Sequence, residues 1–171
     1  VKSVGNSTTL PYDVETLDDA RCAYYLLAES VAARMREEGF RCRCVSISAR
    51  TTQLITSSCQ RVLPRASNLT NDIARMAMQL FGERFARGMP YRSLGLNCSM
   101  LAPDTAPVQL DMLGDEIARM RMEDLDRSID GLRRRYGHQV VQRGVVLANP
   151  RFAAINPRMD HTIHPVPFFG G

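Results

Sequence analysis

The pattern of hydrophobic and polar positions divides the N-terminal part of the chain into strands and helices. Residues 3–10 form a short stretch rich in Ser and Thr that Pro11 closes, which predicts a strand. Apolar side chains then recur at spacings of three and four over 17–35, which predicts an amphipathic helix. Thr16 has an acidic residue three positions later and can cap the start of this helix, and Gly39 is typical of its end.

Two further strands are predicted next. Residues 41–50 alternate between two faces, which is the period of a strand. One face carries Arg43, Val45, Ile47 and Ala49, and the other carries Cys44, Ser46, Ser48 and Arg50. The following strand is expected from Gln53 to Leu63, where Pro64 stops it.

A second helix follows, with Asn68 or Thr70 as its predicted cap. Its apolar face is formed by Ile73, Met76, Ala77, Leu80 and Phe81, and Gly88 and Pro90 end it. Residues 91–101 predict a last strand. One of its faces carries Leu94, Leu96, Cys98 and Met100, and the other carries Tyr91, Ser93, Gly95, Asn97 and Ser99.

The resulting order is β-α-β-β-α-β, which predicts an α+β fold of the split, ferredoxin-like type: a four-stranded antiparallel sheet with two helices on one face. Such a sheet needs to bury only one face, so the other is free for function. If the apolar side of the first strand points to the helices, its open face is formed by Ser3, Gly5, Ser7 and Thr9. The open face then consists of small or hydroxyl-bearing residues with Arg50 at one end, a surface that lets a phosphate backbone approach main-chain N–H groups.

The remaining third of the chain is predicted to be an appendage. Apolar residues at spacings of three and four predict a helix over about 116–136, followed by a possible strand at 139–147 and a loop tail. The apolar positions of this helix are Met122, Leu125, Ile129, Leu132 and Tyr136. The chain therefore divides into a domain at 1–103, a linker at 104–115 and a C-terminal helical extension at 116–171.

The net charge is +4, and all of the excess lies in the first part of the chain. Residues 1–103 hold 13 Lys and Arg against 9 Asp and Glu, whereas residues 104–171 hold 9 of each. Between Phe40 and Asn71 there are five arginines and no acidic residue. A positive field confined to one part of a domain is expected where the partner is a polyanion such as nucleic acid.

The rest of the composition favours a piece of a soluble intracellular protein. The chain begins at Val1 rather than Met, and no apolar run approaches the ~18 residues that span a bilayer. Five cysteines without a Cys-x-x-Cys pair predict reduced thiols that pack in the interior. His161 and His164 have no convincing further ligands nearby in the sequence, so no metal site is expected in this piece.

Several short motifs occur in register along residues 1–103. They are Lys2-Ser3-Val4-Gly5-Asn6-Ser7, Arg50 at the end of the second strand, Gln60-Arg61, and Tyr91-Arg92-Ser93-Leu94-Gly95-Leu96. Together they resemble the little finger domain of Y-family translesion DNA polymerases, most closely the bacterial UmuC/DinB type of the ImpB/MucB/SamB group. The resemblance covers the whole of the predicted β-α-β-β-α-β domain.

The resemblance implies a DNA-binding role for the open face. In that family the little finger lies in the major groove of the primer–template duplex and holds both strands by their backbones, without reading sequence. The residues that the resemblance assigns to DNA are Lys2, Ser3, Gly5, Asn6, Ser7, Arg50, Arg61, Arg92, Ser93 and Asn97. Asn6 and Asn97 depart from the pattern of some relatives, which have Arg at these positions.

The linker contains the segment Gln109-Leu110-Asp111-Met112-Leu113. It resembles the pentapeptide by which bacterial polymerases dock onto the sliding clamp. An extended segment of this kind can insert Leu110, Met112 and Leu113 into an apolar groove while the Gln109 amide hydrogen-bonds at its rim. The alternatives are a chance match and a segment that packs on its own domain.

No arrangement for nucleotidyl transfer is evident in this sequence. That chemistry needs carboxylates that hold two metal ions about 4 Å apart. The pair Asp124-x-Asp126 has suggestive spacing but lies on the exposed side of the predicted helix. The resemblance places the carboxylates and Mg²⁺ in a palm domain on the N-terminal side. We therefore expect no enzymatic activity and no cofactor here.

The expected parent is a nucleotidyltransferase, a DNA-directed DNA polymerase. It is expected to act in translesion synthesis, DNA repair and the SOS response, in the cytoplasm at the nucleoid.

Two other functions remain open for a ferredoxin-like domain. An RNA-binding module is expected to carry aromatic residues on its central strands for base stacking, and only Tyr91 is near such a position. A protein-interaction module is expected to carry large apolar or aromatic side chains on its open face. The acid-free face of Ser, Gly and Arg residues favours nucleic acid over both.

Overall fold

The structure is a computed structural model that describes residues 2–85, 89–105 and 115–157. Its strands are β1 (Ser3–Val14), β2 (Phe40–Thr51), β3 (Thr56–Ser67) and β4 (Tyr91–Pro103). Its helices are α1 (Leu17–Glu37), α2 (Thr70–Arg84), α3 (Asp115–Tyr136), α4 (Gly144–Leu147) and α5 (Pro150–Ala153), with a 3₁₀ turn at His138–Val140. The strands form one antiparallel sheet in the order β1-β4-β2-β3. The predicted α+β fold is confirmed.

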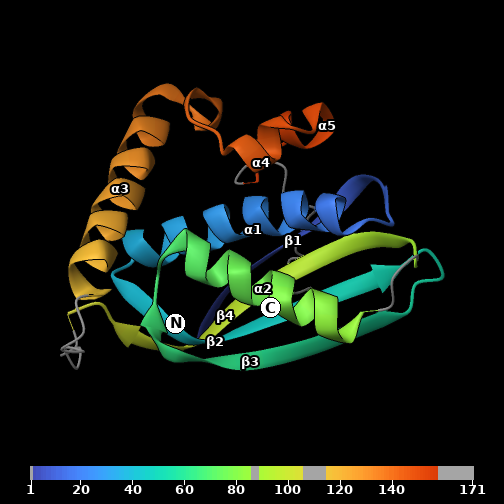
Figure 1. Cartoon of the computed structure of the whole chain (residues 1–171), viewed down its shortest axis with the longest axis horizontal. Coiled ribbons are helices and arrows are strands. Elements are labelled where there is room, and N and C mark those ends of the chain that lie inside the picture. The colour runs from blue at the N-terminus through green and yellow to red at the C-terminus, as the bar shows by residue number, and fades with distance from the viewer. Residues whose placement is uncertain (1, 86–88, 106–114, 158–171) are drawn as a thin grey trace, which may run out of the picture.

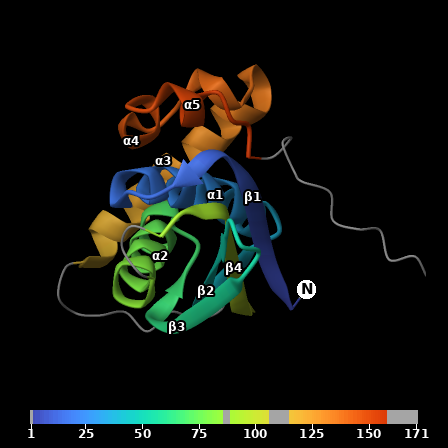
Figure 2. The same cartoon turned by 90° about the vertical axis from the view of Figure 1, so that its right-hand side faces the viewer.

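The described helices all lie on one side of the sheet. Helices α1 and α2 pack directly on it, and α4 and α5 lie over α1 on the far side from the strands (Figures 1 and 2). Helix α3 stands at one end of the molecule and leads the chain from the sheet to this outer layer (Figure 1). Among the described helices, none combines the length and the apolar character needed to cross a membrane.

Helix α1 begins and ends at the residues that the sequence predicts. The Thr16 hydroxyl accepts a hydrogen bond from the backbone N–H of Asp19 at 3.1 Å, which satisfies one of the free donors of the first turn. Gly39 follows the last turn with a φ of 71°, a left-handed conformation that glycine adopts at little steric cost.

Strands β1 and β3 run past the prolines that were predicted to end them. Strand β1 continues through Pro11 to Val14, and β3 continues through Pro64 to Ser67. Both are edge strands, and the pairing of each with its neighbour is irregular near the proline. Proline lacks a backbone N–H, and an edge strand has one side where that donor is not needed. Strand β3 also begins at Thr56, later than predicted.

Neither of the two predicted caps of α2 acts as one. The Asn68 side chain donates to the carbonyl of Phe40 at 3.2 Å, and Thr70 is itself the first helical residue. The N–H of Thr70 instead donates to the carboxylate of Asp126 at 2.9 Å. A negative charge at this position satisfies a free donor and also suits the helix dipole. The cap of α2 therefore comes from α3, which sequence-local reasoning could not find.

The core lies between the sheet and helices α1 and α2, as predicted. It is built on the inward faces of β2 and β4, on α1 and on an aromatic cluster. The fully buried members include Tyr24, Leu27, Val45, Ile47, Ile73, Leu80, Leu94 and Leu96. Burial raises the pKa of the Tyr24 hydroxyl far above its usual value. The five thiols are free, four of them buried, in agreement with the prediction of packing cysteines.

Three side chains do not face the way that strict alternation predicts. Met100, predicted to be inward, is 58% exposed and has a φ of 55°. Arg43 is exposed and donates to the carbonyls of Leu63 and Pro64. Tyr91, predicted to be on the open face, is 6% exposed and packs in the core, because the pairing of β2 with β4 shifts at this end. Irregular pairing and a left-handed residue interrupt the two-residue period.

The C-terminal extension forms helices where a strand and a loop were predicted. Residues 138–140 and Gly144–Leu147 are helical, so the predicted strand at 139–147 is wrong. The loop predicted beyond Asn149 contains α5, and its Phe152 is fully buried. Val146 and Phe152 belong to the same core cluster as the sheet and α1. The apolar side chains of this region are buried by packing on α1, and the segment does not pair as a strand.

Candidate nucleic-acid interface

Cross-strand pairing arranges the open face of the sheet, on the side away from α1 and α2, in four rows. From β1 to β3 the rows are Ser3–Ser99–Cys44–Val62, Gly5–Asn97–Ser46–Gln60, Ser7–Gly95–Ser48–Ser58 and Thr9–Ser93–Arg50–Thr56. None of these residues is acidic, and Arg50 supplies a positive charge at one end. The prediction of a small, hydroxyl-rich open face is therefore confirmed by the register. We call these four rows the open face.

The middle of the open face is hollowed. A shallow depression there is lined by Gly5, Asn6, Ser7, Ser46, Ile47, Ser48, Ser58, Gly95, Leu96 and Asn97. A Cβ atom on Gly5 would lie 2.7 Å from the Asn97 side-chain oxygen, and one on Gly95 would collide with the Ser48 hydroxyl. Glycine at these two positions lets the neighbouring side chains lie flat across the strands. The Asn97 and Ser48 side chains occupy the space beside Gly5 and Gly95, and Gly95 itself is buried.

Strand β1 at the edge of this face is held from the helical side. The Arg34 guanidinium of α1 donates to the carbonyl oxygen of Gly5. The Asn6 side chain points to the same side and donates to the Ser30 hydroxyl at 3.1 Å and to the carbonyl of Pro157 at 2.9 Å. These bonds fix the edge strand, so the positions of its outward residues are set before any partner binds.

Six of the ten residues assigned to DNA lie on the open face. They are Ser3, Gly5, Ser7, Arg50, Ser93 and Asn97. Lys2 is exposed just before β1. Arg92 is exposed near the start of β4, with its guanidinium 3.6 Å from the carboxylate of Asp13. These two cations lie beside the four rows rather than within them.

The remaining two residues, Asn6 and Arg61, do not lie on the open face. Asn6 is 8% exposed and faces α1. Arg61 pairs in register with the core residue Val45, so its side chain belongs to the helical side. There it donates to both carboxylate oxygens of Glu83 on α2, at 2.6 and 3.2 Å. This pair of hydrogen bonds lowers the pKa of the Glu83 carboxyl to about 2. Assigning both residues to the DNA side ignored the alternation of side chains along a strand.

Residues 41–70 contain five arginines and no acidic residue, but several of these arginines form ion pairs with carboxylates of other elements. Arg41 lies 3.1 Å from Glu123 of α3, and Arg65 lies 3.6 Å from Glu116 of the same helix. Together with the pair between Arg61 and Glu83, these contacts neutralise three of the five charges. The positive stretch seen in the sequence is therefore not a continuous positive surface, and Arg50 is the member of it that faces the open side.

The structure also contains a buried ionic cluster that sequence reasoning missed. Arg36 of α1 donates to both carboxylate oxygens of Asp130, at 2.7 and 3.0 Å, and to Asp126 at 3.2 Å. A third contact joins Arg36 to the carbonyl of Asn68 at 2.6 Å. The side chains of Arg36 and Asp126 are 5% and 4% exposed. Charges so deeply buried need such partners, because an unpaired one would be very costly.

A second part of the cluster joins the outer layer to α1. Glu29, 4% exposed, accepts hydrogen bonds from Arg133 and Arg143, each at 2.9 Å. Arg143 also lies 3.4 Å from Asp126, so the two parts share one carboxylate. A signal was available in the sequence: Asp126, Asp130 and Arg133 recur at helical spacing on one side of α3. A charged helix face is usually exposed to solvent, but in α3 the charged face is the one that packs against the rest of the domain.

The apolar side of α3 is correspondingly turned outward. Leu125, Leu132 and Tyr136 are 50%, 44% and 60% exposed. The pair Asp124-x-Asp126, predicted to be exposed, is split: Asp124 is exposed and Asp126 is buried. Because Asp126 is held by two arginines and an N–H, the pair does not fit a metal. No group of three or more potential metal-ligating side chains occurs within the described parts of the chain.

Two predicted features lie outside the described residues. They are the clamp-docking segment Gln109-Leu110-Asp111-Met112-Leu113 and the two histidines, His161 and His164. The docking role of the first, and the expectation that the histidines form no metal site, stay predictions from the sequence.

Comparison with known proteins identifies relatives of the chain. The C-terminal domain of the impB/mucB/samB family matches residues 1–112. DNA polymerase IV of Acetivibrio thermocellus is 33% identical over 147 residues, which cover 86% of this chain and 37% of the relative. DNA polymerase IV of Clostridium acetobutylicum is also 33% identical over 147 residues, covering 86% and 36%. The chain thus spans little more than a third of the length of these relatives.

Solved structures similar to the chain have lower sequence identity. A little finger domain of PolIV in complex with the beta-clamp processivity factor is 19% identical, with a TM-score of 0.46 over 65% of this chain and 98% of that chain. DinB from Sulfolobus solfataricus is 14% identical, with a TM-score of 0.49 over 57% and 28%. Both TM-scores are low, so the fold assignment rests on the sheet order and helix positions described above.

A β-α-β-β-α-β order with one helical face and one open polar face of a four-stranded antiparallel sheet defines a class of α+β domains. Within that class, the chain belongs to the impB/mucB/samB family, and residues 1–112 match the family's C-terminal domain. The family predicted from the sequence motifs is confirmed.

Proposed function

We propose that the chain is the non-catalytic DNA-gripping part of a Y-family DNA polymerase, and that its open face holds the sugar–phosphate backbone of primer–template DNA. The observation that carries this proposal is the register of the open face. It is hydroxyl-rich and acid-free, and it carries Arg50 at one end. Backbone N–H groups, hydroxyls and Arg are the groups by which proteins hold phosphates without reading bases.

The burial of Tyr91 bears on the alternative of an RNA-binding module. Such a module stacks bases on aromatic side chains of its sheet face. Tyr91 was the candidate for this role, and it is 6% exposed within the core. The remaining residues of the open face contain no aromatic ring. Backbone gripping is therefore favoured over base stacking.

The wider role follows from the relatives. Those reported above are named DNA polymerase IV, and one structural neighbour is a complex with a beta-clamp. We infer that the parent protein is a DNA polymerase acting in translesion synthesis on chromosomal DNA in the cytoplasm. Its Mg²⁺ ions are held by a palm domain outside this chain. Residues 109–113 tether it to the sliding clamp.

The decisive experiment uses two neighbouring serines of β3. Ser58 pairs with Ser48 on the open face, and Ser57 pairs with Ala49 on the helical side, yet both are exposed. Ser58→Glu places a negative charge toward the phosphates and is expected to weaken binding about tenfold. Ser57→Glu carries the same charge on the other side and is expected to have a much smaller effect. Fluorescence anisotropy with a labelled primer–template duplex at several salt concentrations measures both.

Three further results are expected if the open face holds phosphates. Affinity falls as salt rises, because binding releases counterions from the DNA. Arg50→Ala reduces the salt slope by about one and weakens binding to all sequences alike. Arg61→Ala has a smaller effect, because Arg61 is paired with Glu83 on the helical side. Equal effects of Ser57→Glu and Ser58→Glu, or binding that ignores salt, would refute the proposal.

A further inference from the structure

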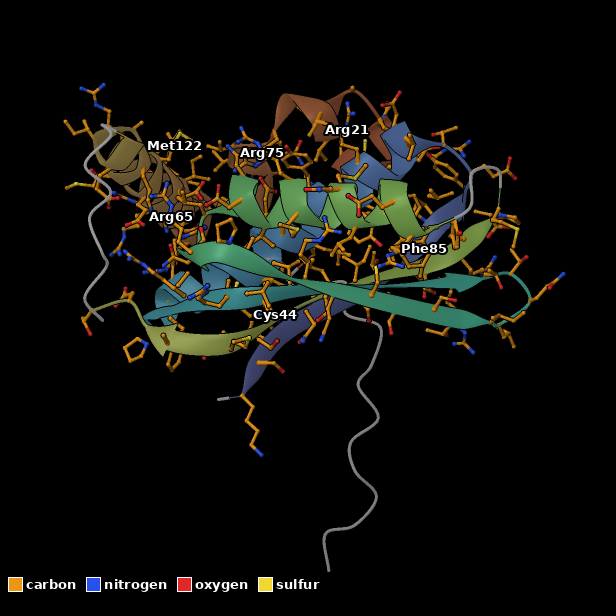
Figure 3. All side chains as sticks on the ribbon, turned by 60° about the horizontal axis from the view of Figure 1, so that its bottom comes forward. Arg21, Cys44, Arg65, Arg75, Phe85 and Met122 are labelled. Atoms are coloured by element: carbon orange, nitrogen blue, oxygen red, sulfur yellow. The ribbon has the colours of Figure 1, made fainter. Side chains whose placement is uncertain are left out.

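A second candidate surface lies on the helical side of the molecule, between α1, α2 and the start of α4. It is a groove of about 560 Å³ in the part of the chain that the structure describes. Arg21 and Tyr25 come from successive turns of α1, and Arg75 and Met78 come from successive turns of α2. Arg143 and Val145 close one end. Figure 3 shows Arg21 and Arg75 on the helical side, away from the strand that carries Cys44.

The rim of this groove is positively charged. Arg21, Arg75 and Arg143 line it, and none of the described residues that line it is acidic. Arg75 is exposed. Arg21 lies 3.6 Å from Asp18, and because both of these side chains are well exposed, water screens the pair and leaves Arg21 open to exchange partners. Two exposed cations therefore stand on opposite helices across the groove.

The floor of the groove is apolar and pre-organised. Tyr25, Met78 and Val145 are half-buried and pack against the core cluster. Arg143 is fixed by hydrogen bonds to Glu29 at 2.9 Å and to the Asn71 side-chain oxygen at 2.7 Å. Its guanidinium lies over the Tyr25 ring, 5.7 Å from the centroid. The aromatic face is thus already covered by a cation of the protein itself.

This arrangement distinguishes between two kinds of anionic partner. Nucleic acid in a basic groove stacks its bases on exposed aromatic faces, and here Arg143 covers the Tyr25 ring. A peptide helix with acidic and apolar side chains fits both features, because two antiparallel helices that lie side by side over an apolar floor form a groove for it. Arg75 and Met78 are one helical turn apart, so a carboxylate and an apolar side chain at the same spacing would meet them.

We propose that this groove docks an acidic amphipathic peptide segment of a partner protein. The apolar side chains of the peptide insert between Tyr25, Met78 and Val145, and its carboxylates pair with Arg21 and Arg75. Since the groove and the open face are on opposite sides of the sheet, the peptide and DNA bind together. This role is separate from the proposed grip on DNA and does not depend on it.

The test measures fluorescence anisotropy of the whole chain with a labelled amphipathic peptide about four turns long, made of Glu, Ala and Leu with leucines along one face. Two control peptides replace Glu by Lys or Leu by Ser. The variant Arg21→Glu with Arg75→Glu is expected to weaken binding at least about tenfold, because like charges then face each other across the interface. Arg121→Glu reverses an exposed charge on α3, outside the groove, and is expected to leave binding unchanged.

Each outcome decides the proposal. The proposal is supported if binding requires both the acids and the leucines of the peptide. The binding should also be lost in the double variant and should persist when duplex DNA is bound. No binding of the acidic peptide, or equal binding by the double variant and Arg121→Glu, overturns it. Binding of a labelled oligothymidylate that depends on Arg21 and Arg75 overturns it in favour of single-stranded nucleic acid. Circular dichroism of each variant checks that the fold is unchanged, which is expected because these arginines are exposed.

Discussion

A buried carboxylate is tolerated only where several donors surround it, and Asp126 shows how this chain provides them. It receives the guanidinium groups of Arg36 and Arg143 and the first N–H of α2. Two residues earlier on the same helix, Asp124 is exposed. Both have the same side chain and nearly the same place in the sequence. The two side chains point about 200° apart around the helix axis, so Asp126 is buried in the ionic cluster whereas Asp124 faces solvent.

This pair provides a matched test at the residue scale. Asp126→Asn keeps the side-chain volume and an acceptor for the Thr70 N–H, but removes the charge that faces the buried Arg36 and the partly buried Arg143. The free energy of unfolding is expected to fall by about 3 kcal/mol, as when one partner leaves a buried ion pair. Asp124→Asn is expected to change it by less than about 0.5 kcal/mol. Urea unfolding curves compare the two, and equal midpoints would contradict the account of Asp126.

At the scale of elements, α4 and α5 are too short to be stable as isolated helices. They hold their place because Val146 and Phe152 enter the core cluster beside α1. Phe152 meets the Tyr12 ring edge-on with 5.7 Å between centroids. Tertiary packing and the hydrogen bonds of Arg143 thus override the strand preference of the valines in this segment. The extension is part of the same folded body as the domain that precedes it.

A second pair of substitutions tests this role of the extension. Phe152→Ala removes a fully buried ring and is expected to lower the free energy of unfolding by about 3 kcal/mol. Leu147→Ala, at a side chain that is 53% exposed, is expected to cost less than about 0.5 kcal/mol. Thermal unfolding followed by circular dichroism measures both. An unchanged midpoint for Phe152→Ala would mean that the extension is not part of the cooperative core.

At the scale of the whole molecule, the sheet separates two surfaces of different chemistry. The open face offers short hydroxyl groups and one arginine. The helical side offers arginines around an apolar groove. The proposed clamp segment comes between β4 and α3 in the chain.

The clamp segment can be tested independently of DNA binding. Leu110→Ala with Leu113→Ala removes two of the proposed apolar anchors, and retention of the chain on an immobilised bacterial sliding clamp is expected to be lost. Affinity for the primer–template duplex is expected to stay unchanged. Leu125→Ala with Leu132→Ala makes the same change at two exposed leucines of α3 and is expected to leave retention intact. Undiminished retention of the first variant would refute the assignment.

The sequence by itself determined the order of the elements over residues 1–103, the helical termini at Thr16 and Gly39, and the composition of the open face. These follow from local periodicity and from residues whose preferences act within a few positions. The family followed from motifs in register over the same stretch. Ser3, Gly5, Ser7 and Arg50 were placed correctly because side chains alternate along a regular strand.

Only the tertiary structure decided the features that depend on contacts between distant segments. It placed Arg61 against Glu83, turned Tyr91 into the core and brought Asp126 to the start of α2. It also turned the charged side of α3 inward. Charges and irregular strand pairing depend on what lies across the fold, and no local pattern specifies that partner. The open face was therefore predictable from the sequence, whereas the ionic cluster beneath the extension was not.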